Sequence, residues 1–377
     1  MNPKPYLTAL AISLAATLTS AFGQNWVATS SPSNNWYMVT SSADGNKLSA
    51  VVQGGGIYTS TNSGAAWISN NAPIANWFGI ASAGDGNKLV AVASAKPIYI
   101  SSDAGNTWTI SESSISNFVA VASSASGEKL VAARFNSGVY TSTNSGSTWV
   151  SNDVPSQAWT TVASSADGCI LMALGYRGLI YISTNSGLTW AGKGATNTFW
   201  NASACSADGR QMMASIGTKI YRSLDFGDTW ALTSAPTAFW TSIASSADGR
   251  KLAAAHTTGI YISTNRGDNW TLTTTPFQTW QAIASSADGN NLLVGATSGP
   301  LYTRTATSPP SLKISASQSN AVISWVVPTR NFTLQQNPEP GTTNWTDVAP
   351  PPVMTNLYNE VSVPLPGDAM FYRLLYP

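Results

Sequence analysis

Residues 240–270 read WTSIASSADGRKLAAAHTTGIYISTNRGDNW, and this stretch recurs along the chain with small changes. It opens on an aromatic landmark, turns at Asp248-Gly249, continues through an apolar run to Tyr261, and ends in an eight-residue box closed by Trp270. The landmarks recur every 40 or 41 residues, at Trp36, Trp77, Phe118, Trp159, Trp200, Trp240 and Trp280. Repeats of this length are typical of supersecondary units that pack side by side. The chain is therefore built from seven copies of one unit.

Each unit contains four short segments that favour β-strands. In the sixth unit these are residues 240–246, 251–255, 259–263 and 269–273, which are rich in β-branched and aromatic residues and are separated by glycine-containing turns. Four strands per unit at this period are typical of a propeller blade. A helical solenoid is excluded, since the apolar residues show no 3.6-residue period. The sequence predicts an all-β, seven-bladed β-propeller over residues 24–307.

The two ends of the repeat region complement each other. The seventh unit stops after Leu301-Tyr302, without a box or a closing Trp. The missing piece stands at the other end as residues 25–30 (NWVATS), where Trp26 precedes Trp36 by ten residues, as Trp230 precedes Trp240. We therefore expect the N-terminal strand to complete the last blade and to leave no open edge.

The first 23 residues have the pattern of a secretory signal peptide. One cation, Lys4, precedes the apolar run from Leu7 to Gly23, and Ala21-Phe22-Gly23 places small residues at the −3 and −1 positions of a cleavage site. No later stretch is apolar and long enough to span a bilayer. The mature chain is expected to be secreted, to the extracellular space, the cell surface or the periplasm.

The last seventy residues abandon the repeat. Ser308-Pro309-Pro310 reads as a linker, and alternating stretches such as AVISW and NEVSVPL predict a small β-sandwich over residues 308–377. This tail resembles the fibronectin-III-like modules ending in F-Y-R-L that close many secreted bacterial proteins. The resemblance implies a role in surface display or spacing.

The boxes carry a second resemblance. STNSGAAW, SSDAGNTW, STNSGSTW, STNSGLTW, SLDFGDTW and STNRGDNW are similar to the Asp-box, or bacterial neuraminidase repeat, with the pattern S-x-D-x-G-x-T-W. Sialidases, xyloglucan-cleaving glucanases, sortilin-type receptor domains and the photosystem II assembly factor carry this box. The resemblance covers roughly residues 25–305 and implies the propeller fold, but it is shared by too many activities to imply one of them.

The box residues have structural roles. An Asn or Asp side chain at the third position can accept a hydrogen bond from a backbone N–H two residues on, the Gly supplies a positive φ, and the Trp packs between blades. The third positions are Asn62, Asp103, Asn144, Asn185, Asp225 and Asn265, and the closing residues are Trp67, Trp108, Trp149, Trp190, Trp230 and Trp270. Asn is a poor calcium ligand, so no metal site is expected in the boxes.

Composition limits the classes of partner. The 377 residues carry a net charge of +1 with 9% charged residues, which is too few cations for a nucleic-acid surface. One His and two Cys argue against most zinc sites, and no cofactor is expected. Cys169 and Cys205 fall in adjacent units near equivalent turns, so a disulfide between them is left open. We expect a monomer.

A catalytic centre is hard to assemble from these residues. Glycosidases need two carboxylates about 5–10 Å apart, yet nearly every propeller carboxylate belongs to an Asp-Gly turn or a box, Glu128 included. Glu112 and Asp153 stand outside these turns, in adjacent blades, and are interpreted as solvated outer-strand residues. His256 has no second His to work with, which favours a surface or ligand contact. No catalytic residue is predicted, and a sialidase- or xyloglucanase-like hydrolase remains the alternative.

Candidate binding residues lie where the repeats disagree. The loops between second and third strands, and the links between blades, should share the face opposite the boxes, and loops on a rigid scaffold often carry function. These segments hold Phe135, Asn136, Tyr176, Arg177, His256, Phe199, Phe239 and Phe277. Aromatic rings beside polar donors suit a sugar or a peptide; the alternative for the three link Phe is packing beneath the loops.

The sequence thus predicts a secreted, non-enzymatic binding or scaffold protein, with a glycan as first choice of ligand and a protein partner as second. A role like that of the photosystem II assembly factor is the third possibility, which the signal peptide and the tail sandwich disfavour.

Overall fold

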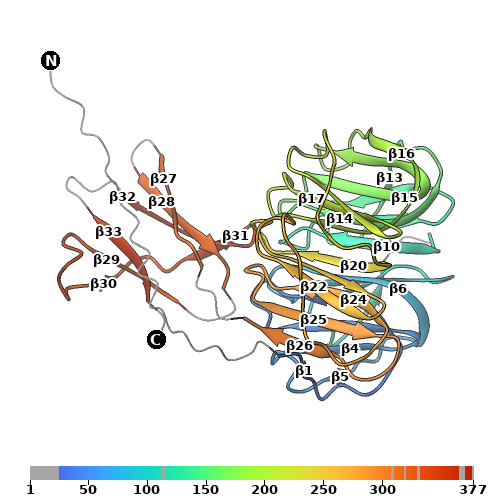
Figure 1. Ribbon diagram of the computed structural model, residues 1–377, viewed down its shortest axis with the longest axis horizontal. Coiled ribbons are helices and arrows are strands. Elements are labelled where there is room, and N and C mark those ends of the chain that lie inside the picture. Colours follow the sequence, from blue (N-terminus) through green and yellow to red (C-terminus); the bar gives the residue numbers. More distant parts are fainter. Residues whose placement is uncertain are drawn as a thin grey trace.

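The computed structural model describes residues 25–111, 115–306, 310–317, 320–328, 332–364 and 370–375. Within these ranges every regular element is a β-strand, and the strands form a large body of several sheets with a smaller module beside it (Figure 1). The predicted signal peptide, residues 1–23, lies outside the described residues. The all-β propeller expected from the repeats is confirmed.

The strands of residues 25–305 pair in an order that follows the repeats, although blades 1 and 2 are joined into one sheet and blades 4 and 5 into another; we number the blades by repeat. Blade 1 contains β2 Trp36–Ser41, β3 Leu48–Gly55, β4 Ile57–Ser60 and β5 Ile68–Ser69. Blade 2 contains β6 Ala75–Ser82, β7 Leu89–Ala93, β8 Tyr99–Ser101 and β9 Thr109–Ile110. Blade 3 contains β10 Phe118–Ser123, β11 Leu130–Arg134, β12 Val139–Ser142 and β13 Val150–Ser151. Blades 4 and 5 contain β14 Ala158–Ser164 and β15 Leu171–Ser183, then β16 Ala191–Cys205, which both blades share, and β17 Met212–Ile216, β18 Lys219–Ser223 and β19 Ala231–Leu232. Blade 6 contains β20 Trp240–Ser245, β21 Leu252–His256, β22 Gly259–Ser263 and β23 Thr271–Leu272. Blade 7 contains β24 Trp280–Ser285, β25 Asn291–Ala296, β26 Tyr302–Thr305 and the N-terminal strand β1 Val27–Ala28.

The N-terminal strand closes the last blade, as the sequence predicts. Strand β1 pairs antiparallel with β26, with Val27 opposite Thr303, and occupies the outer edge of the sheet β1-β26-β25-β24. Trp26 is buried beside Trp280 in the apolar cluster between blades 6 and 7, and its indole N–H donates to Thr273 Oγ1 at 3.0 Å. The first residues of the repeat region therefore hold the last ones in place.

A circle of backbone hydrogen bonds surrounds the propeller axis. In each Asp-Gly turn the residue before the turn's Asp (Ser126 in blade 3) donates its N–H to the carbonyl of the equivalent residue in the next blade, at 2.7 to 2.8 Å. The members, in order, are Ala43, Gly84, Ala125, Ala166, Ala207, Ala247 and Ala287, and the last donates to the first. We call these residues the axial ring. Its closure shows that the seven repeats surround one axis.

The landmark aromatics form the core between blades. All seven are at most 1% exposed, and each meets the Tyr of its own blade edge to face, with ring centroids 5.3 to 6.1 Å apart. The half-buried box Trp residues pack against the same inter-blade clusters, as predicted. Edge-to-face contacts add to the burial energy of large rings, so the aromatic repeat holds neighbouring blades together.

The box turns differ from expectation in one bond. Asn185 Oδ1 accepts from the N–H of Thr189, four residues on, at 2.9 Å, and from Ser183 Oγ at 3.0 Å. The bond spans four residues because Ser186 and Gly187 both adopt positive φ (58° and 91°) and wrap the chain around the side chain. The expected two-residue bond occurs instead in the Asp-Gly turns, where Asp248 Oδ1 accepts from Arg250 N at 3.0 Å.

The tail forms two sheets around its own core. One sheet has the order β27-β28-β32-β31 and the other β30-β29-β33. The strands are β27 Lys313–Ser317, β28 Asn320–Val326, β29 Thr333–Asn337, β30 Thr346–Asp347, β31 Val353–Thr355, β32 Tyr358–Pro364 and β33 Phe371–Leu375. Trp325, Ile323, Leu334, Val361 and Tyr372 are buried between the sheets. We call this sandwich the C-terminal module; strand β31 lies at its end nearest the propeller (Figure 1).

Candidate binding face

The loops and turns of the propeller separate onto two faces. The loops between second and third strands bond to the links between blades, for example Gln53 N to Asn35 O at 3.0 Å and Ala238 N to Thr218 O at 3.2 Å. The box turns bond to the Asp-Gly turns at the other end of the strands, for example Ser63 N to Asn46 O at 2.8 Å. We call the first end the loop face and the second the box face.

The aromatic residues singled out on the loop face are exposed. The exposed fractions are 54% for Phe135, 46% for Tyr176, 43% for Phe199, 69% for Phe239 and 89% for Phe277. The alternative that the three link Phe pack beneath the loops is therefore wrong. Large exposed apolar side chains on one face of a protein are typical of interaction sites.

The structure brings two of these residues into contact. Tyr176 in β15 lies opposite Phe199 in β16, with ring centroids 4.1 Å apart and the rings nearly perpendicular. The residues Phe199, Phe239 and Phe277 stand in consecutive links, before blades 5, 6 and 7. We call Tyr176, Phe199, Phe239 and Phe277 the aromatic arc. Asn136 is exposed beside Phe135 with a positive φ of 52°, and the side chain of Arg177 lies outside the described part of the chain.

His256 differs from the others because it is half-buried. Its ring packs on Trp240 and Tyr261, with centroids 5.6 and 5.5 Å away, and Nδ1 accepts from the N–H of Thr258 at 3.3 Å. Burial lowers the pKa of His256 below its ordinary value. The imidazole is thus held neutral at neutral pH, and it supports the core beneath the loop face.

Sequence reasoning missed two residues of this face. Ile74 is 77% exposed and stands three residues before its landmark, the position that Phe277 occupies before Trp280. Aligning the links on the landmarks would have found it. Arg134 lies opposite Phe118, the one landmark that is not Trp, and donates through Nε to Ser116 O at 2.8 Å. No repeat pattern marks an Arg at this position.

Carboxylates are concentrated on the box face. In the described part of the propeller, Asp153 is the one carboxylate outside the Asp-Gly turns and boxes, and it is exposed. Glu112, the other carboxylate that the sequence places outside the turns and boxes, lies outside the described residues. The box carboxylates serve their turns, and hydrogen bonds from the Thr229 side chain and N–H lower the pKa of Asp225 to about 2. Among the described residues no three His, Cys, Asp or Glu side chains gather as a metal site would require.

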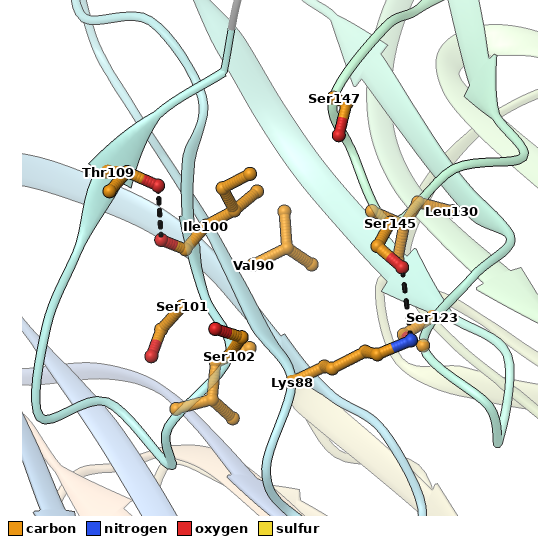
Figure 2. A pocket seen from close by; sticks show the side chains of 12 residues that line it. Lys88, Val90, Ile100, Ser101, Ser102, Thr109, Ser123, Leu130, Ser145 and Ser147 are labelled. Atoms are coloured by element: carbon orange, nitrogen blue, oxygen red, sulfur yellow. Dashed lines mark hydrogen bonds between the residues drawn. The ribbon is translucent and has the colours of Figure 1, made fainter.

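Two cavities lie between blades at the box end. The first, of about 220 Å³, separates blades 2 and 3, where Lys88 crosses to donate to Ser145 Oγ at 3.2 Å (Figure 2). The second, of about 450 Å³, separates blades 4 and 5 and is lined by Trp190, Phe226 and the ion pair Lys193–Asp228, 2.7 Å apart. Small-molecule sites usually measure 300–1,000 Å³, so only the second has the size of a ligand site.

The two cysteines are free thiols. Burial, with the charges of Asp208 and Asp167, raises the pKa of the Cys205 thiol to about 12, which keeps it protonated and unreactive. Cys169 Sγ lies 3.4 Å from Lys129 Nζ. No helix in the described ranges has the length and apolarity to cross a membrane.

Comparisons with known proteins identify the fold and no family. No protein-family model matches the chain. No curated protein matches it either.

Several different proteins of known structure share the architecture of this chain, at low sequence identity. YCF48 bound to a D1 peptide is 12% identical with a TM-score of 0.60, covering 75% of this chain and 97% of that one. U3-55K is 10% identical with a TM-score of 0.63, covering 75% and 98%. The GH74 xyloglucanase from Xanthomonas campestris is 14% identical with a TM-score of 0.61, covering 80% of this chain and 59% of that one. These likenesses show the β-propeller fold.

Proposed function

We propose that this chain is a secreted, non-enzymatic binding protein that recognises a protein segment through the aromatic arc on its loop face. The observation that carries the proposal is the exposure of Phe199, Phe239 and Phe277 in three consecutive links. Exposed Phe side chains on a rigid scaffold gain free energy when a partner covers them, and a few such anchors usually supply most of a protein interface's affinity.

The chemistry of the arc favours protein over glycan. Its link residues are Phe, which offers apolar area without a hydrogen-bonding group, whereas a sugar needs directional donors and acceptors beside the ring. YCF48, which shares the fold, binds a peptide of D1 in its solved structure. That propellers of this kind can present a peptide site supports the choice.

The loops near the arc also lack a bond that holds the other loops. In blades 1, 2 and 4 the landmark indole N–H donates to a carbonyl of the preceding blade, for example Trp36 to Gly299 O at 2.9 Å. Within the part of the chain that the structure describes, the buried indole N–H groups of Trp200, Trp240 and Trp280 have no acceptor. Loops without this bond can adjust to a partner at lower cost, which favours the sector of blades 5 to 7.

A peptide selection tests the proposal. The mature chain, residues 24–377, is used to select from a phage-displayed random peptide library, and the affinity of the selected peptides is measured by calorimetry. Replacing Phe199, Phe239 and Phe277 by Ala should weaken binding about 100-fold or more, because three exposed anchors are lost. The thermal midpoint should stay the same, since none of the three is buried.

The matched control is Leu188→Ala, which removes an equally apolar side chain, 83% exposed, from the box face. It should leave peptide affinity unchanged. Selected peptides that bind the triple variant and the wild type equally would contradict the proposal, as would a library that yields no binder.

A glycan is the second candidate, and a specific observation favours it. Trp190 and Phe226 line the cavity between blades 4 and 5 together with the Lys193–Asp228 pair, and aromatic rings with polar partners suit a neutral saccharide. A glycan array with a hydrolysis screen, run on the same protein, separates the candidates. If Phe226→Ala abolishes glycan binding and the triple Phe variant retains it, the ligand site lies on the box face.

A further inference from the structure

The C-terminal module contacts the propeller at its axis. Val326, Val327, Leu357 and Tyr358 of the module pack against the alanines of the axial ring. Leu357 also lines the small cavity that the ring encloses together with the inner-strand serines. The residues at positions 356 and 357 form the two-residue turn between β31 and β32, so a hairpin tip meets the centre of the box face.

One position of the axial ring is not Ala, and the hairpin tip fills the space beside it. Six repeats place Ala in the ring, but the second repeat has Gly84. A methyl group built on Gly84 would lie 2.9 Å from Leu357 Cδ2, closer than such atoms approach. The missing methyl therefore leaves the space that the Leu357 side chain fills.

The hairpin tip also has an unusual residue for its backbone conformation, a leucine with positive φ. Asn356 and Leu357 both have positive φ, 48° and 69°, as a tight hairpin turn of this type requires. Gly or Asn normally occupies such positions, and a leucine there costs about 1 kcal/mol or more. A Leu in this conformation is explained when its side chain has a site to fill.

The neighbouring residues reinforce the contact. The N–H of Val327 donates to the Leu357 carbonyl at 3.0 Å, which fixes the turn to the end of β28. Burial and the negative charges of Asp248 and Asp208, both in Asp-Gly turns, raise the pKa of Tyr358 to about 12. The phenol, which is neutral at physiological pH at its ordinary pKa, thus stays neutral to still higher pH in this contact.

We infer that the axial ring is a docking site for the hairpin tip of this chain's own C-terminal module, with Leu357 seated over Gly84, and that the docked module closes the propeller axis at the box face. The two domains then move as one body. If the proposed function holds, the module docks on the face opposite the binding site and leaves the loop face accessible to the partner.

A double-mutant cycle on the mature chain tests the inference. Gly84→Ala restores the Ala of the other six repeats, and a propeller without docking should tolerate it. We expect it to displace the Leu357 side chain and weaken docking: calorimetric unfolding separates into two transitions, and the radius of gyration in solution X-ray scattering rises to the extent that the module is released. Leu357→Ala should loosen the module too, and adding Gly84→Ala to Leu357→Ala should have no further effect because the clash is gone.

The cycle distinguishes docking from strain within the propeller. The added methyl would also lie 3.3 Å from Ala125 O. If that contact caused the effect, Gly84→Ala would cost as much in the Leu357→Ala background as alone, and the inference would be overturned. A Gly84→Ala variant whose unfolding and scattering both match the wild type would overturn it as well. Val353→Asp, at a position 66% exposed on the same hairpin, is the control and should behave as wild type. None of these readouts depends on a ligand, so their failure is distinct from failure of the proposed function.

Discussion

Removing residues 24–31 from a chain that starts at residue 24 is expected to lower the thermal midpoint of the entire propeller by roughly 10 °C. The deletion removes β1 from the edge of blade 7 and takes the buried Trp26 ring away from Trp280. It also exposes the unpaired edge of β26 and opens the face between blades 6 and 7. Because each blade is held by its two neighbours, we expect one cooperative transition at lower temperature rather than fraying of one blade.

The measurement is calorimetry on two chains, one that starts at residue 24 and one that starts at residue 32. Two substitutions serve as controls: Trp26→Ala should reproduce most of the loss, and Val27→Ser, at an exposed position, should reproduce little of it. An unchanged midpoint after truncation would mean that the N-terminal strand does not hold the ring.

Trp240→Ala is expected to destabilise the propeller by about 3–5 kcal/mol. The Trp240 ring is 1% exposed and contacts both Tyr261 and Trp270, at 5.6 and 6.3 Å between ring centroids, so its removal leaves a cavity between blades 5 and 6. Denaturant unfolding monitored by circular dichroism measures the change.

The preceding residue provides the matched control for that substitution. Phe239→Ala removes a ring that is 69% exposed, and its effect on stability should stay within about 0.5 kcal/mol. Equal losses for the two variants would contradict the division of these aromatic residues into buried landmarks and the exposed aromatic arc.

The ring of blades could be predicted because the same sequence pattern occurs in every blade. Seven landmarks and six boxes report the same unit, and the missing box at one end matches the extra Trp26 at the other. The two-residue bond assigned to the boxes was wrong, because the positive φ of the residue before the Gly is set by the whole turn and leaves no mark in composition.

The contacts of the C-terminal module could not be predicted in the same way. Gly84 is visible in the sequence as an exception to six alanines, but its partner Leu357 lies 273 residues further along the chain in a region without repeats. Likewise, exposure separates Phe239 from Trp240, although both are large aromatic residues next to each other. Burial of a link residue depends on how the neighbouring blade's loop runs, which a single sequence does not encode locally.

Native-state hydrogen exchange of the seven axial-ring amides tests the closed ring most directly. The account predicts that all seven N–H groups, including that of Ala287 bonded to Ala43 across the junction of the last and first blades, exchange only by global unfolding and with the same free energy. Faster exchange of the Ala287 amide than of the other six would show that the ring opens at this junction, and it would contradict the account.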